Sequence, residues 1–107
     1  MLSKKKCTPC QGGIPPLSLK EIKPFLQNLD GWELIAERKI MKQYIFKTYD
    51  KAIQFVNQVA RLAEEEAHHP YIEINYKKVN IIIFTHKING LHENDFILAS
   101  KCDLIKK

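Results

Sequence analysis

The sequence predicts an α+β sandwich, in which helices lie to one side of strand hairpins in the order α-β-β-α-β-β-α. Apolar residues recur at helical spacing in three segments, at residues 18–29, 50–67 and 92–105. Four other segments, at residues 32–36, 40–46, 71–76 and 79–85, alternate in polarity or are rich in β-branched residues, as strands are. The strands come in two closely linked pairs with helices around them, and this arrangement favours hairpins in an α+β fold.

The first helix is expected to begin at Ser18. Ser18 and Glu21 have the spacing of a capping box, in which each side chain binds a free backbone N–H of the first turn. Pro24 conflicts with this interpretation because proline lacks an N–H and crowds the preceding turn, so the helix is either kinked there or begins later. The turn at Asp30-Gly31 is expected to end the helix, whose apolar face would carry Ile22, Leu26 and Leu29.

The first hairpin is expected to join residues 32–36 to residues 40–46 through a short link at Arg38. In its first strand the residues that share one face would be Trp32, Leu34 and Ala36. The second hairpin is expected to join residues 71–76 to residues 79–85, and His86 would then stand at the end of the last strand.

The middle helix has the strongest signal, with Asp50 as the expected N-cap and Pro70 preventing its continuation. Its apolar residues form two stripes, which predicts burial on more than one side. One stripe is Ile53, Val56, Ala60, Ala63 and Ala67, and the other is Phe55, Val59 and Leu62. After a turn at Asn89-Gly90, residues 92–105 are expected to form the last helix, with Phe96, Ala99 and Cys102 on one stripe.

The length of 107 residues suits one domain, expected at residues 17–107, after a flexible leader at residues 1–16 that is rich in Gly and Pro. The formal charge is +5, but five lysines lie at the two ends of the chain. Without them 12 basic residues face 12 acidic ones, and we see no internal basic cluster of the kind that binds nucleic acid.

No apolar run approaches the roughly 20 residues that span a bilayer, and the first ten residues lack the apolar core of a secretory signal. We therefore expect a soluble, cytoplasmic protein without a membrane partner. Cys7 and Cys10 form a Cys-x-x-Cys pair, which is typical of a redox site or half of a zinc site, or else belongs to a leader with incidental thiols.

All four histidines lie between residues 68 and 92. His68 and His69 are expected at the end of the middle helix and His86 at the end of the last strand. A single histidine at a helix end is usually structural, because it interacts with the free carbonyls and the helix dipole. Two adjacent histidines and a third at a strand end instead favour proton transfer near neutral pH. A zinc set of Glu64, His68 and His86 is an alternative, although its spacing is not that of a strong helical metal motif.

The order and intervals of these residues resemble the signature of the pterin-4a-carbinolamine dehydratases. The matching positions are Glu64, His68-His69-Pro70, Tyr76, Thr85-His86 and Asp95, with similar flanking residues at Gly31-Trp32, Gly90-Leu91 and Leu98-Ala99. The resemblance covers roughly residues 17–105, and so many spaced positions are specific for a motif. His92, Ala67 and Ile72 depart from residues that are common in the family.

The resemblance implies a four-stranded antiparallel sheet with three helices packed on one face, which agrees with the order of elements above. It also implies a hydro-lyase that converts 4a-hydroxytetrahydrobiopterin, or a related pterin, to the quinonoid dihydropterin in tetrahydrobiopterin recycling. It implies three catalytic histidines, with His68 and His86 as the acid–base pair and His69 mainly binding and orienting the pterin. Glu64 and Asp95 would orient the imidazoles or hold the polar edge of the ring, and Pro70 would also contact the substrate.

The resemblance implies neither a metal nor a cofactor, and it implies a homodimer or homotetramer. The alternative function is a non-catalytic binding protein of the same fold, such as a dimerisation cofactor of transcription factors or an assembly factor with its own protein partner. The complete set of three histidines favours the enzyme.

Overall fold

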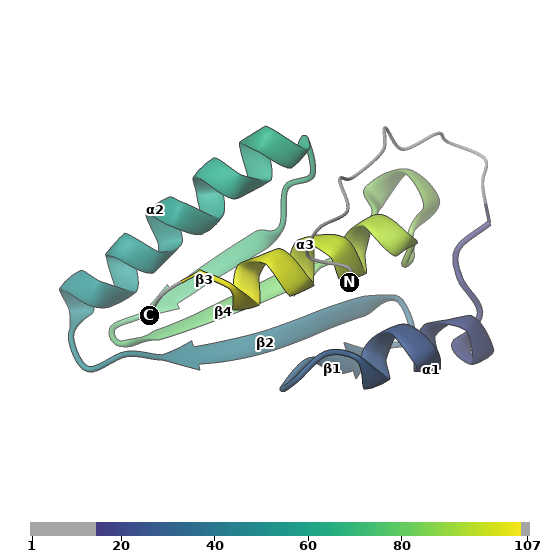
Figure 1. The fold of residues 1–107 in the computed structure, drawn as a ribbon, viewed down its shortest axis with the longest axis horizontal. Helices are drawn as coiled ribbons and strands as arrows, with labels where there is room; N and C mark the ends of the chain where they lie inside the picture. Colours follow the sequence, from purple (N-terminus) through teal and green to yellow (C-terminus); the bar gives the residue numbers. More distant parts are fainter. Residues whose placement is uncertain (1–14, 106–107) are drawn as a thin grey trace.

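The structure is a computed structural model that describes residues 15–105, and it confirms the predicted order of helices and strands (Figure 1). The predicted leader, with Cys7 and Cys10, lies almost wholly outside the described residues. A short 3-10 helix before the last helix was not predicted. The elements are α1 (Leu19–Gln27), β1 (Glu33–Ile35), β2 (Lys39–Ile45), α2 (Tyr49–Glu66), β3 (Tyr71–Asn75), β4 (Lys78–Ile83), η2 (His86–Ile88) and α3 (Glu93–Asp103).

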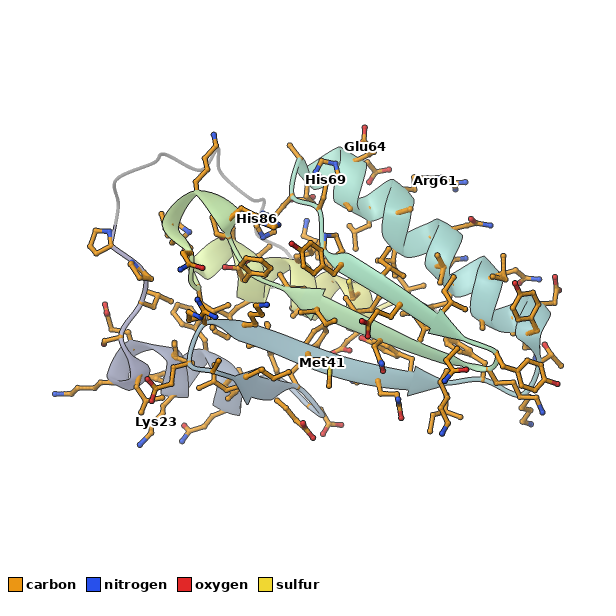
Figure 2. All side chains as sticks on the ribbon, turned by 180° about the vertical axis from the view of Figure 1, so that it is seen from behind. Lys23, Met41, Arg61, Glu64, His69 and His86 are labelled. Atoms are coloured by element: carbon orange, nitrogen blue, oxygen red, sulfur yellow. The ribbon has the colours of Figure 1, made fainter. Side chains whose placement is uncertain are left out.

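The four strands form one antiparallel sheet in the order β1-β2-β4-β3. Figure 1 shows the helices on the near side of the sheet, and Figure 2, seen from behind, shows the uncovered face with Met41 of β2. The register pairs Ile40 of β2 with Ile83 of β4, and Tyr71 of β3 with Ile82 of β4. The predicted arrangement, with all helices on one face, is therefore confirmed.

The core lies between the sheet and the helices. Alternate residues of the two central strands are buried, as the period of a half-covered sheet requires. They pack against apolar residues of α2 and α3 in one cluster, whose largest members include Ile40, Tyr44, Phe55, Val59, Ile81, Ile83, Phe96 and Leu98. Within residues 15–105 no helix is both long and apolar enough to cross a membrane.

Helix α1 begins as predicted. The Ser18 hydroxyl accepts from the Glu21 N–H, and the Glu21 carboxylate accepts from the Ser18 N–H at 2.9 Å. The bond from the Ser18 N–H, helped by the nearby Ser18 hydroxyl, lowers the pKa of the Glu21 carboxyl. The helix runs through Pro24, so the alternative of a later start is wrong. Pro24 lies on the exposed side of α1, where water can bind the carbonyl that lacks an N–H partner.

Two local expectations were wrong. The first strand ends at Ile35, because Ala36 and Glu37 have φ of 52° and 58° and form a turn closed by a bond from Arg38 N–H to the Ile35 carbonyl. Such turns usually contain Asn-Gly, whereas this one contains Ala36-Glu37. The N-cap of α2 is Thr48, whose hydroxyl accepts from the Lys51 N–H at 3.1 Å. Asp50 instead lies in the first turn.

The two apolar stripes of α2 have different surroundings. In one stripe Phe55 and Val59 are buried against the sheet and α3, and Leu62 is half-buried. In the other only Ala63 is buried, while Ile53 and Val56 are half-buried and Ala60 and Ala67 are exposed. The prediction that both stripes are buried is wrong for the single chain, because the sheet and α3 cover only one side of the helix.

A polar cluster joins the end of α3 to the first hairpin. The Asp103 carboxylate accepts from Trp32 Nε1 at 2.9 Å, from Lys42 Nζ at 2.8 Å and from the Tyr44 hydroxyl at 2.5 Å. Burial, together with the bond to Asp103, raises the pKa of Tyr44 well above its ordinary value. Burial also raises the pKa of the neighbouring Cys102 to about 12. The cluster therefore holds the end of α3 against the first hairpin and keeps the Tyr44 side chain uncharged in the core.

We predict that Tyr44→Phe lowers the free energy of unfolding at neutral pH by about 1.5–3 kcal/mol, because it removes a hydrogen bond to a charged group. The unfolded chain loses its Tyr44 proton near pH 10, while the folded protein keeps it. Stability that is present below about pH 10 is therefore lost as the pH rises further. In urea unfolding above about pH 10, the free energy of unfolding of Tyr44→Phe should fall less steeply with pH than that of the wild type.

The control for this experiment is Tyr49→Phe, which changes an exposed tyrosine. This variant should follow the wild type at every pH. Identical alkaline profiles for the wild type and Tyr44→Phe would contradict the prediction.

Candidate active site

His68 and His69 lie just beyond α2, rather than in its last turn. The helix ends at Glu66, and Ala67 has a left-handed conformation with φ of 52°. The His68 N–H still donates to the Ala63 carbonyl at 3.0 Å, which closes the helix end. The chain therefore turns sharply at Ala67 and reaches β3 through Pro70, with both histidines in the connection.

His86 is the first residue of η2, rather than the last residue of a strand, because β4 ends at Ile83. The preceding residue, Thr85, forms an isolated bridge with Gly90, whose carbonyl accepts from the Thr85 N–H at 2.8 Å. This bridge closes the loop that carries His86. Gly90 also lies against Pro16, whose Cβ would stand 2.5 Å from any side chain added there, so a glycine is required.

The two connections meet in an open cavity of about 510 Å³. Its lining includes four of the predicted site residues, His68, His69, Pro70 and His86. Figure 2 shows His69 and His86 at the same end of the molecule, with Glu64 beside His69. The volume lies in the range of small-molecule sites. The other residues of the lining are Ala67, Tyr71, Phe84, Thr85 and Lys87.

Asp95 lies behind His68 and is fully buried. Its Oδ1 is 2.6 Å from His68 Nε2, and its Oδ2 accepts from the Thr85 hydroxyl at 2.9 Å and from the His92 N–H at 2.8 Å. The bond to the His92 N–H also belongs to the capping box of α3. Asp95 is not part of the cavity lining, so the geometry favours the expectation that it orients an imidazole over the expectation that it contacts the pterin.

Glu64 pairs with His69 as Asp95 pairs with His68, but both side chains of this second pair are exposed to solvent. Glu64 Oε1 lies 2.6 Å from His69 Nε2, and the side chains are 79% and 61% exposed. The alternative zinc set is not assembled: among residues 15–105 no three His, Cys, Asp or Glu side chains are placed to hold a metal ion. Glu64 is instead paired with His69, and His68 is paired with Asp95.

An aromatic wall borders His86, and sequence reasoning did not identify it. The Phe84 ring lies 4.3 Å from the His86 ring, and the Tyr71 ring lies 5.4 Å from both. Lys39 Nζ lies 4.8 Å from the centre of the Phe84 ring. The wall could have been found from the register of the second hairpin, which places the start of β3 beside the end of β4.

Comparison with known proteins decides the family. The sequence profile of the Pterin 4 alpha carbinolamine dehydratase family matches residues 15–105. The chain belongs to this family. A protein from Rickettsia canadensis, provisionally named a pterin-4-alpha-carbinolamine dehydratase, is 48% identical over 104 residues that cover 96% of this chain and 95% of its own. One from Rubrobacter xylanophilus with the same provisional name is 43% identical, covering 95% of each chain.

The crystal structure of a Brucella melitensis protein described as a transcriptional coactivator/pterin dehydratase has a similar fold. Its TM-score is 0.78 at 34% identity, covering 82% of this chain and 95% of that chain. The resemblance noted from the motif is therefore confirmed at the level of family and fold. The roles of the individual site residues stay predictions.

The two histidine–carboxylate pairs should differ in their contribution to stability. We predict that Asp95→Asn lowers the free energy of unfolding by about 2–3 kcal/mol, because an amide leaves buried donors without their acceptor. Glu64→Gln should change it by less than about 0.5 kcal/mol, because an exposed ion pair contributes little. Urea unfolding of both variants at neutral pH measures the difference, and equal effects would contradict it.

Proposed function

We propose that the protein is a 4a-hydroxytetrahydrobiopterin dehydratase, a hydro-lyase of tetrahydrobiopterin recycling. The observation that carries this proposal is the convergence of His68, His69 and His86 on one cavity in a chain of this family. The substrate is a pterin that bears a hydroxyl group at C4a, and the product is the quinonoid dihydropterin. The catalytic domain is residues 17–107, and its location is the cytoplasm.

The reaction breaks the C4a–O bond and removes the proton from N5, so that one water molecule leaves and a C=N bond forms. Hydroxide is a poor leaving group, and it therefore needs a proton from an acid as the bond breaks. Positioned acid–base groups of this kind typically accelerate a reaction about 10²–10⁴-fold. We assign these steps to His68 and His86, without a metal or cofactor.

The contacts of His68 suit the role of base. Its Nε2 is bound to Asp95, which leaves Nδ1 to accept the N5 proton. His86 would then donate the proton to the departing hydroxyl, and exchange with water would restore both imidazoles. His69 and Pro70 would bind the ring, with Glu64 orienting His69.

We predict that His68→Ala and His86→Ala each lower kcat for the pterin at least about 100-fold, because each removes one positioned proton-transfer group. The measurement is the loss of the ultraviolet signal of the 4a-hydroxytetrahydropterin, compared with its spontaneous rate. The control is His92→Ser, which changes the histidine outside the cavity lining and keeps a good N-cap for α3.

The same assay is run with a chelator. Acceleration that resists the chelator supports a dehydratase that works through histidines alone. Near-wild-type turnover of both alanine variants would contradict the assignment of the acid–base pair. A folded wild-type protein without any acceleration would favour the second candidate, a binding protein, for which the description of the Brucella protein as a transcriptional coactivator gives a specific reason.

We also propose that the protein forms a homodimer or homotetramer. The apolar stripe of Ile53, Val56 and Ala60 on α2 is only partly covered by the single chain, and Leu104 after α3 is 67% exposed. A second apolar stripe on a helix that already buries another face against the core is typical of a contact with a partner. A second copy of the chain would bury this stripe.

We predict that Val56→Lys lowers the mass measured by sedimentation equilibrium, because it places a charge in the stripe. Gln54→Lys is the matched control, since it adds the same charge to an exposed position of α2 outside the stripe. An unchanged mass for both variants would exclude this surface as the interface.

A further inference from the structure

Thr85 is a buried polar residue to which the proposed mechanism has assigned no role. It lies between β4 and η2, directly before His86, and it is 4% exposed. Its hydroxyl donates to Asp95 Oδ2 at 2.9 Å, on the carboxylate whose other oxygen faces His68. One residue is therefore linked to both histidines of the proposed acid–base pair, to His86 through the chain and to His68 through Asp95.

The direction of this hydroxyl is unusual for its position. A threonine at the N-cap of a helix normally accepts a bond from a backbone N–H of the first turn. Thr85 is the N-cap of η2, but its side chain makes no such bond. The Ile88 N–H instead donates to the backbone carbonyl of Thr85 at 3.3 Å. The hydroxyl is thus used for Asp95, and a local cap does not explain it.

We propose that Thr85 is a positioning residue that holds both histidines in place, an inference that rests on the proposed function. Its hydroxyl fixes the carboxylate that orients His68. Its backbone, paired with Gly90 through bonds of 2.8 and 3.3 Å, fixes the start of the short helix at His86. Thr85 thereby sets the position of one imidazole relative to the other.

The chemistry of the bonds gives this role a specific consequence. An ionised carboxylate has only acceptors, so Asp95 can bind His68 only if Nε2 carries a proton. The Thr85 hydroxyl and the His92 N–H both bind Oδ2, and together they leave Oδ1 directed at His68. Loss of the hydroxyl removes one of these restraints on the carboxylate. The preference of the neutral His68 ring for the tautomer with a free Nδ1 is then weaker.

The test compares Thr85→Val, which keeps the shape and removes the hydroxyl, with Thr85→Ser, which keeps the hydroxyl. Thr85→Val should lower kcat about tenfold with KM within about twofold, by analogy with metal-ligating histidines, for which loss of a supporting partner costs about 10–100-fold. Thr85→Ser should stay within about twofold of the wild type. Thr48→Val is the matched control, because it removes a threonine hydroxyl bond at the opposite end of α2 from His68.

A second readout does not depend on turnover. Nitrogen NMR spectra of labelled histidine rings distinguish the neutral tautomers, and His68 should be protonated at Nε2 in the wild type, Thr85→Ser and Thr48→Val. Thr85→Val should show a mixture of tautomers. A wild-type protein without turnover would overturn the proposed function, while the spectra would still decide whether Thr85 fixes the ring.

Three results would overturn the proposal itself. The first is a Thr85→Val protein that keeps both kcat and the Nε2–H tautomer. The second is a changed tautomer with unchanged kcat in an active enzyme, which would show that the hydroxyl fixes the ring without serving the reaction. A loss of kcat in Thr48→Val equal to that in Thr85→Val would also count against positioning, since general destabilisation would then explain both.

Discussion

The buried carboxylate of Asp95 is the constraint on which the cavity depends. A charge that is removed from water costs several kcal/mol unless donors surround it. Its three donors come from His68 after α2, from Thr85 after β4 and from the first residue before α3. The charge is satisfied only when these three segments meet, so the fold cannot bury Asp95 without also placing His68 at the cavity. The same contact stabilises the fold and forms the site.

The register of the second hairpin supplies the other half of this arrangement. Tyr71 pairs with Ile82 and Asn75 pairs with Lys78, so the residues before β3 lie beside those after β4. The register is set at the far end of the hairpin, where Tyr76 adopts a φ of 56° in the turn. A slip of one residue would turn every side chain of β3 to the opposite face. A turn remote from the cavity thus determines which residues line it.

The sequence was sufficient where the interacting groups are close along the chain. Ser18 and Glu21 predict the start of α1 because their bonds are local, and Pro70 marks the end of the helical segment. The sequence was insufficient where strand pairing determines the local structure, as in the turn where Ala36 has a left-handed backbone conformation. The expectation that Asp50 is the N-cap of α2 was also wrong, because Thr48 is a good cap too and the geometry of the chain entering α2 selects it. The family resemblance indicated Glu64 and Asp95, but their division between His69 and His68 needed the structure.

Because Asp95 pairs with His68 and Glu64 with His69, these two adjacent imidazoles have different physical properties. Both histidine–carboxylate distances are 2.6 Å, yet the side chain of His68 is 12% exposed and its partner fully buried, whereas His69 and Glu64 are mostly exposed. Water competes for the bond of the exposed pair, so that pair restrains its ring weakly. In the buried pair water is excluded, and the ring keeps one orientation and one tautomer. Proton transfer requires a ring in a fixed position, while a ring that contacts the face of a ligand gains from adjustment. On the proposed mechanism, His68 therefore suits the acid–base step and His69 suits binding, although the two stand next to each other in the sequence.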